Sequence, residues 1–132
     1  MMKVKGHEID FDITSPDDLQ RYLAASDAME KAAATLPPMP SPAEMASPAG
    51  IRAYTAYITG QCKLVTDFID AAFGDGTCNA LLGPKTSLDA LMDVTDALRD
   101  AIAAQGQRAG ERITGYMPNR ATRRAAQKKA DK

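Results

Sequence analysis

The sequence predicts a mainly α-helical fold, with a short N-terminal β-hairpin packed on a bundle of about three helices. Three observations indicate this fold class. Apolar residues recur every three or four positions in three long stretches, which is the spacing of one helix face. Before these stretches, apolar and polar side chains alternate, as in a strand with one buried face. Proline and glycine separate the stretches, so we assign residues 1–116 to one helical domain and expect residues 117–132 to form a flexible, disordered basic tail.

The hairpin is expected at residues 3–13, where Gly6-His7 interrupts the alternation and forms the turn. Four apolar side chains should face inward. A two-stranded hairpin is marginally stable alone, so this one must lie on the helices or on a strand of another chain. The inward-facing positions are Val4, Ile9, Phe11 and Ile13.

The first helix is expected to begin at Ser15-Pro16, a capping residue followed by the residue that best fits the first helical position. It ends by Leu36, because Pro37 and Pro38 cannot continue a helix. One side of it is apolar and should face the core. That side consists of Leu19, Tyr22, Leu23, Ser26, Met29 and Ala33.

A proline-rich linker at residues 37–50 precedes the central helix and holds five of the eight prolines of the chain. The central helix spans residues 51–73, with a start near Ser47-Pro48 and an end at Gly74. Apolar side chains cover roughly half of its circumference. A stripe of that width packs against more than one neighbour, so we expect this helix at the centre of the bundle.

Two further helical segments follow the central helix. The first is a short turn of helix that Thr77 caps and that ends at Leu82. The second is the third long helix, residues 88–105, and beyond Gln105 we expect glycines to interrupt the helical pattern. Thr86 or Ser87 caps this helix, its apolar stripe consists of Leu88, Leu91, Met92, Thr95, Leu98 and Ile102, and the glycines are Gly106, Gly110 and Gly115.

Four aspartates form a second stripe on the third helix, away from its apolar side. Either this stripe is a solvated surface, or it docks something basic, such as the tail of a neighbouring copy. The second alternative would make the stripe a self-association surface in a homo-oligomer. The four residues are Asp89, Asp93, Asp96 and Asp100.

Charge is distributed unevenly along the chain, although the net charge is only −1. Residues 117–132 carry six basic residues and one acid, so the remainder of the chain is acidic. This asymmetry indicates interaction with a partner. Nucleic-acid binding through the tail is one alternative, but no aromatic residue lies between Met117 and Lys132 to stack on a base. The candidate contacts in the tail are Arg120, Arg123 and Arg124.

No motif in the sequence predicts catalysis, a cofactor or a metal. His7 is the one histidine, and no Ser-His-Asp or Cys-His pattern includes it. Cys62 and Cys78 have no nearby Cys or His, so we expect two unpaired thiols rather than a zinc site or a disulfide. Residues 83–86 resemble the end of a phosphate-binding loop, but Pro84 separates the glycine from the lysine. We therefore expect a protein that is not an enzyme.

Membrane contact and secretion are also not expected. No window of the sequence approaches the roughly 18 consecutive apolar residues of a membrane span. The polar N-terminus lacks the apolar core of a signal peptide.

Several local sequences occur in an informative order. A hairpin with Gly6 and Phe11-Asp12-Ile13 precedes an acid-capped helix and then the stretch Phe68-Ile-Asp-Ala-Ala-Phe-Gly-Asp-Gly-Thr77. A Leu82-Gly83 turn, another helix and a tail with Asn119-Arg and Arg123-Arg124 follow. Together they resemble a group of small tailed-phage proteins, the tail assembly chaperones of long-tailed siphophages. The resemblance covers most of the chain, and the Phe-Gly-Asp-Gly-Thr helix end is its sharpest part.

This resemblance implies a non-enzymatic scaffold that acts in the host cytoplasm. Chaperones of this group coat the long, helical, apolar tape measure protein, keep it soluble and then yield it to the tail tube protein. They are usually absent from the mature virion, and a ribosomal frameshift often produces a longer form. Two alternatives remain open: a structural head–tail or tail-completion component that stays in the virion, and a small nucleic-acid-binding protein that acts through its basic tail.

The residues themselves are compatible with a binding role. A wide apolar helix face, seven methionines and a flexible linker suit adaptable binding of an apolar partner. On the central helix we single out four residues for partner contact, with burial in the core as the alternative. These are Tyr54, Tyr57, Leu64 and Phe68.

Overall fold

The computed structural model describes residues 2–83 and 85–116. It confirms the predicted fold class, a mainly helical domain with a short N-terminal hairpin. The basic tail, with Arg120, Arg123 and Arg124, lies outside the described residues. In chain order the elements are β1 (Met2–Val4), β2 (His7–Ile9), α1 (Pro16–Ala33), the 3-10 helix η1 (Glu44–Ala46), α2 (Pro48–Phe73), α3 (Thr77–Leu82) and α4 (Leu88–Tyr116).

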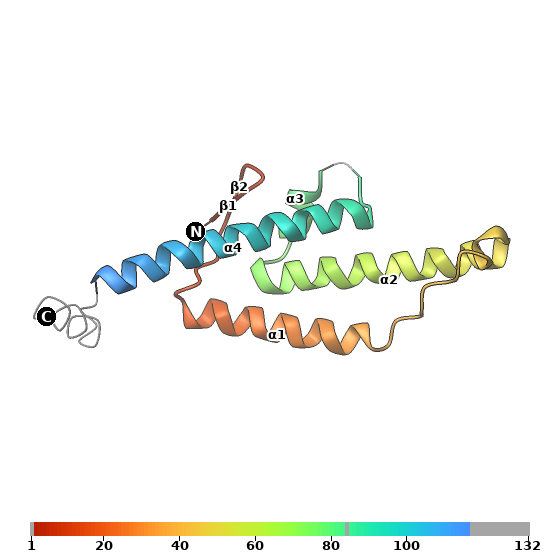
Figure 1. The fold of residues 1–132 in the computed structure, drawn as a ribbon, viewed down its shortest axis with the longest axis horizontal. Helices are drawn as coiled ribbons and strands as arrows, with labels where there is room; N and C mark the ends of the chain where they lie inside the picture. Colours follow the sequence, from red (N-terminus) through yellow and green to blue (C-terminus); the bar gives the residue numbers. More distant parts are fainter. Residues whose placement is uncertain (1, 84, 117–132) are drawn as a thin grey trace, which may run out of the picture.

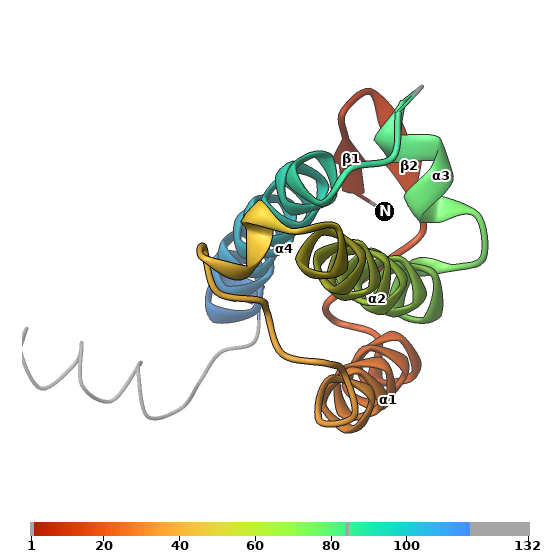
Figure 2. The same ribbon diagram turned by 90° about the vertical axis from the view of Figure 1, so that its right-hand side faces the viewer.

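Helix α2 lies at the centre of the fold, as its wide apolar stripe predicts. It contacts α1, η1, α3 and α4, whereas α1 makes its main contacts with α2 alone. Viewed along the helices, α1 and α4 lie on different sides of α2, and the hairpin and α3 lie on the side of the molecule away from α1 (Figures 1 and 2). The site described below depends on this order, because α1 has one main helical neighbour to cover its apolar side.

The hairpin turns one residue earlier than the sequence pattern suggests. Strands β1 and β2 pair antiparallel with Val4 opposite His7, so His7 belongs to a strand and the predicted Gly6-His7 turn is wrong. The turn is Lys5-Gly6, and both residues have positive φ, 49° and 81°. A two-residue hairpin turn of this kind needs the left-handed conformation at both positions, and Gly6 adopts it without strain.

The segment after the hairpin is fixed to α4 by one side chain. The amide of Gln105 accepts a hydrogen bond from the Ile13 backbone N–H at 2.8 Å and donates one to the Phe11 carbonyl at 2.9 Å. Because both bonds satisfy backbone groups outside any strand, they replace the sheet pairing that this segment lacks. Phe11 and Ile13 therefore face the core, as predicted, although the strands end before them.

An aromatic cluster joins the hairpin segment to α1 and α2. Phe11 is 1% exposed, and its ring lies 5.2 Å from that of Phe73 in an edge-on arrangement. Tyr22 of α1 contacts Phe11, Phe68 and Phe73, with ring centroids 5.5 to 6.1 Å apart. Edge-to-face packing at these distances adds to the energy of burial. The cluster is the point at which the three parts of the domain meet.

Serine caps begin the three long helices, as the sequence indicates. Ser15, Ser47 and Ser87 each accept a hydrogen bond from the backbone N–H three residues later. Thr77 does not cap α3, because Gly76 occupies the cap position. Instead the carboxylate of Asp70, in α2, accepts a hydrogen bond from the Cys78 N–H at 3.0 Å.

The apolar stripes of α1 and α4 are only partly buried. On α1, Leu19, Leu23 and Ala33 are exposed, contrary to expectation, and the buried residue is Ala25, which the predicted stripe omits. On α4, Met92 is exposed and Val94, which the predicted stripe omits, is fully buried. The buried face of α4 therefore runs through Leu91, Val94 and Leu98.

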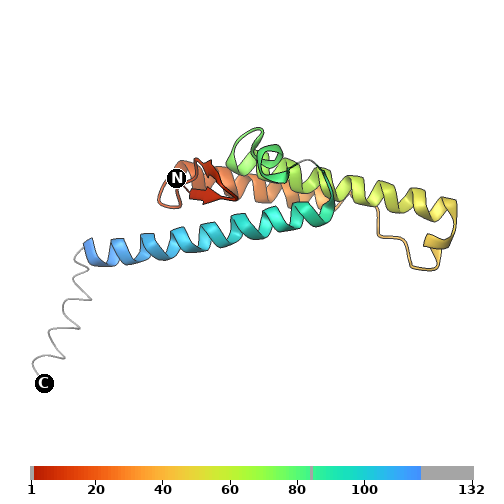
Figure 3. The ribbon, with the colours of Figure 1, turned by 90° about the horizontal axis from the view of Figure 1, so that it is seen from above.

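Helix α4 is 11 residues longer than predicted and ends at Tyr116. The glycines after Gln105 were expected to interrupt it, but a single glycine costs only about 1 kcal/mol in a helix. At Gly106 the chain leaves room for a side chain, since a Cβ there would make an ordinary contact of 3.4 Å with Ile13 Cδ1. The end of α4 extends past the rest of the domain (Figure 3).

Candidate partner-binding groove

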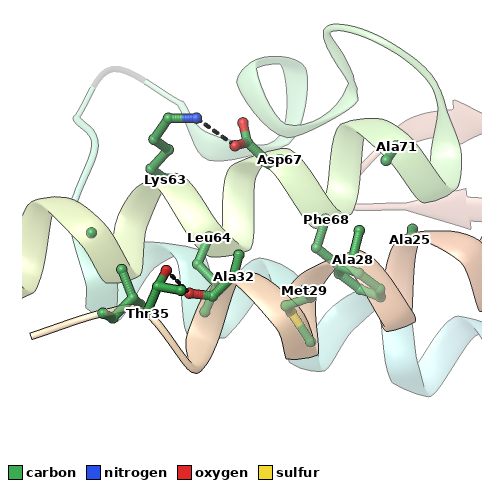
Figure 4. Close-up of a pocket in the computed structure, with 12 residues that line it drawn as sticks. Ala25, Ala28, Met29, Ala32, Thr35, Lys63, Leu64, Asp67, Phe68 and Ala71 are labelled. Atoms are coloured by element: carbon green, nitrogen blue, oxygen red, sulfur yellow. Dashed lines mark hydrogen bonds and ion pairs between the residues drawn. The ribbon is translucent and has the colours of Figure 1, made fainter.

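A groove of about 400 Å³ lies between α1 and α2 (Figure 4). It exists because α1 presents small side chains along this side: Ala25, Ala28 and Ala32 line the groove from α1. Residues three and four apart share a helix face, so these alanines form one continuous wall. The remaining lining consists of Met29, Thr35, Leu36, Gly60, Lys63, Leu64, Asp67, Phe68 and Ala71.

The groove is largely apolar, and its polar groups are already bonded. Lys63 and Asp67 form an ion pair at 2.7 Å on its α2 rim, where both side chains are exposed. The hydroxyl of Thr35 donates to the carbonyl oxygen of Ala32 at 2.9 Å. An exposed ion pair between residues one helical turn apart contributes little to stability. The groove therefore offers an occupant mainly apolar contact.

Two of the four residues singled out for partner contact lie in this groove. Leu64 and Phe68 line it and are half-buried. Phe68 also packs edge-on against Tyr22, so it belongs to the aromatic cluster as well as to the groove. Tyr54 and Tyr57 are half-buried and lie closer to the start of α2, outside the groove lining.

The alanine wall was not recognised from the sequence. Its signal is the spacing of Ala25, Ala28 and Ala32, which places three small residues on one face of α1. The predicted apolar stripe of α1 consists mainly of larger side chains and omits these alanines. Only the arrangement of α1 against α2 shows that the small residues leave a hollow between the helices.

The four aspartates of α4 are all exposed. Among the described residues the ion pairs are Asp18–Arg21 and Lys63–Asp67, so none of the four takes part in one. Their role as a self-association surface stays a prediction, because the tail that would bind them lies outside the described part of the chain. The four residues are Asp89, Asp93, Asp96 and Asp100.

The two cysteines differ in environment. Cys78 is fully buried, and burial raises the pKa of its thiol above the usual value, while a contact with Thr66 acts in the opposite direction. Cys62 is half-buried, and both thiols are free. Within residues 2–83 and 85–116, no group of three His, Cys, Asp or Glu side chains is placed to hold a metal ion. None of the described helices is long and apolar enough to cross a membrane.

The fold and groove define a small, mainly helical protein with an N-terminal β-hairpin and an open apolar surface between two helices. The chain belongs to a family of unknown function, DUF6673, whose model matches residues 5–127. No curated protein and no solved structure matches the chain.

Proposed function

We propose that this protein is a non-enzymatic tail assembly chaperone that binds an apolar helical segment of the tape measure protein in the groove between α1 and α2. Binding keeps the tape measure protein soluble in the host cytoplasm until the tail tube protein replaces the chaperone, which then leaves before the virion is complete. The proposal combines the resemblance to siphophage tail chaperones with one observation: an open, apolar groove that runs along two helices.

The shape of the groove suits a helix. The alanines of the α1 wall allow close approach of a third helix, whose larger aliphatic side chains would fill the 400 Å³ of the groove. Amphipathic helices bind such grooves through apolar side chains one turn apart. Each aliphatic side chain that becomes fully buried contributes roughly 1.5–3 kcal/mol.

The composition of the groove suits a client protein with many similar segments, as proposed for the tape measure protein. Met29 and Leu64 line it from opposite helices, and methionine adapts to side chains of different shape. The groove presents few polar groups that would demand a fixed pattern of hydrogen bonds. Selection by apolar shape alone is appropriate for a chaperone that coats a long protein at many positions.

Co-expression with the tape measure protein of the same genome tests this function. We expect the long protein to be insoluble alone and soluble in a complex with many copies of this chain. Ala28→Glu places a charge in the groove at an exposed position, so the fold should be retained while the client precipitates. Ala104→Glu, at an exposed position on α4 outside the groove, is the matched control and should behave as the wild type.

Two results would reject the proposal. If the client is equally insoluble with and without the wild-type chain, the protein is not its chaperone. If Ala28→Glu solubilises the client as well as Ala104→Glu does, the groove is not the binding site. Mass spectrometry of purified virions provides a second check, because a structural component stays in the particle and a chaperone does not.

A further inference from the structure

The apolar face of α4 continues beyond the part of the helix that the domain covers. Ile102 packs against the core, and Ala109 and Ile113 follow on the same face at spacings of seven and four residues. Ile113 is 51% exposed, and residues 110–115 are all exposed. This projecting end also holds Gly110 and Gly115, which weaken a helix that has no other support. Contact with a second surface would supply that support.

A second groove, of about 230 Å³, lies on the other side of the contact between α1 and α2. It is bounded by three helices, because α4 contributes its far wall. Met29 and Phe68 line both grooves, since they lie at the seam between α1 and α2. The remaining lining consists of Tyr22, Ser26, Val65, Ile69, Phe73, Thr95, Leu98, Arg99 and Ile102.

Exposed apolar side chains share a helix face with residues that line this second groove, on both α1 and α4. Leu19 and Leu23 precede Ser26 by seven and three residues and share its face of α1. They are 38% and 60% exposed. On the α4 wall, Met92 precedes Thr95 by three residues and is 56% exposed. The unburied parts of the two predicted apolar stripes therefore continue the helix faces that line the groove, and exposed apolar side chains grouped in this way are typical of an interaction surface.

The projecting end of α4 matches this surface in length, and the sequence from residue 107 onward is opposite to it in charge. Residues 107–115 extend about 14 Å along the helix axis, and the α1 wall from Leu19 to Met29 extends about 17 Å. The two walls are acidic: α1 carries four acidic and two basic residues, and residues 88–105 carry four aspartates and one arginine. In contrast, residues 107–132 carry eight basic and two acidic residues. Opposite charge favours association and fixes its orientation.

We propose that the projecting end of α4 binds the groove between α1, α2 and α4 of a second copy of this chain, with Ile113 against Leu19 and Leu23. The contact is head-to-tail, because the end of one copy occupies the groove of the next and leaves its own groove free. Its groove shares Met29 and Phe68 with the first groove but opens on the other side of the α1–α2 pair, so this contact can be tested without the client. The client and a second copy would bind on opposite sides of the α1–α2 pair.

Sedimentation of the full chain alone, over a range of concentrations, tests this contact. The wild type should form oligomers that grow with concentration and weaken as salt is raised. Ile113→Asp and Leu23→Asp each place a charge at an exposed apolar position and should raise the dissociation constant at least about tenfold. Thr114→Asp and Ala24→Asp carry the same change in charge on other faces of the same helices, so they are the matched controls and should weaken association much less than Ile113→Asp and Leu23→Asp do.

Mixing the two defective variants distinguishes a head-to-tail contact from a symmetric one. Ile113→Asp retains an intact groove and Leu23→Asp retains an intact end, so together they should form a one-to-one dimer that grows no further. A wild type that stays monomeric at every concentration would overturn the proposal. Two variants that associate normally, or a mixture that stays monomeric, would overturn it as well. Circular dichroism of each variant confirms that it is folded.

Discussion

Replacement of Gly50 by alanine should destabilise the domain, although alanine is the better helix former. Gly50 is buried in the first turn of α2, where η1 crosses it. A Cβ at this position would overlap the backbone carbonyl of Glu44 and lie 3.1 Å from the nitrogen of Met45. Because these are backbone atoms, no side-chain rotation can make room, and η1 must move away from α2.

The size of the effect follows from two opposing terms. Forcing an extra methyl group into a packed site costs typically about 1–3 kcal/mol. The higher helix propensity of alanine stabilises the folded state by at most about 1 kcal/mol relative to glycine, and by less at a helix end. Displacement of η1 also weakens the cap, since Ser47 Oγ accepts from the Gly50 N–H and donates to the Glu44 carbonyl. We therefore expect the free energy of unfolding to fall by about 1–2 kcal/mol.

Gly60→Ala is the matched control for this measurement. A Cβ at Gly60 would lie 2.9 Å from Leu36 Cδ2, which is the end of a flexible side chain and can rotate away. Its free energy of unfolding should stay unchanged or rise by up to about 1 kcal/mol. Urea unfolding followed by circular dichroism measures both variants. If Gly50→Ala is as stable as Gly60→Ala, the packing of η1 against α2 is not as described.

Three further predictions concern the hairpin segment and the cysteines. Gln105→Ala removes the two hydrogen bonds to the segment after β2, so urea unfolding should show a loss of about 1–3 kcal/mol; an unchanged midpoint would contradict the role of that amide. Hydrogen bonds from Thr14 lower the pKa of Asp12, so their stabilisation is present at neutral pH and is lost as pH falls through that lowered pKa. Thr14→Val should therefore differ from the wild type less at pH 2 than at pH 7, and a titration of the Asp12 carboxyl by NMR should show its pKa rise. In the native protein a thiol reagent should label Cys62 before Cys78, because Cys78 is fully buried and its pKa is raised; equal rates would show that this part of the core opens readily.

Local signals in the sequence were sufficient for the helix starts and for the central position of α2. A serine before proline or leucine specifies a cap without reference to the rest of the chain, and all three serine caps are present. The wide apolar stripe of α2 predicts several packing partners, and α2 contacts α1, η1, α3 and α4. The cap of α3 was not predictable, because Asp70 supplies it from another helix.

The extent of burial on α1 and α4 depends on tertiary arrangement. The periodic pattern marks Leu23 and Met92 as apolar positions, but it cannot show that α1 makes its main contacts with one helix or that Met92 is exposed. The length of α4 was underestimated because each glycine was treated as an end. The candidate site was predictable only in part. Leu64 and Phe68 are large apolar residues that the sequence pattern identifies, whereas the alanines of the groove are recognised only from the packing of α1 on α2.

The central claim is that the groove between α1 and α2 contacts the tape measure protein. Site-specific photocrosslinking tests it most directly, with a photoreactive residue at Ala28 and the same residue at Ala104 as the control, in cells that express the phage tail genes. Our account predicts a crosslink from position 28 to the tape measure protein and none from position 104. A position 28 that crosslinks only to other copies of this chain, or equal crosslinking from both positions, would contradict it.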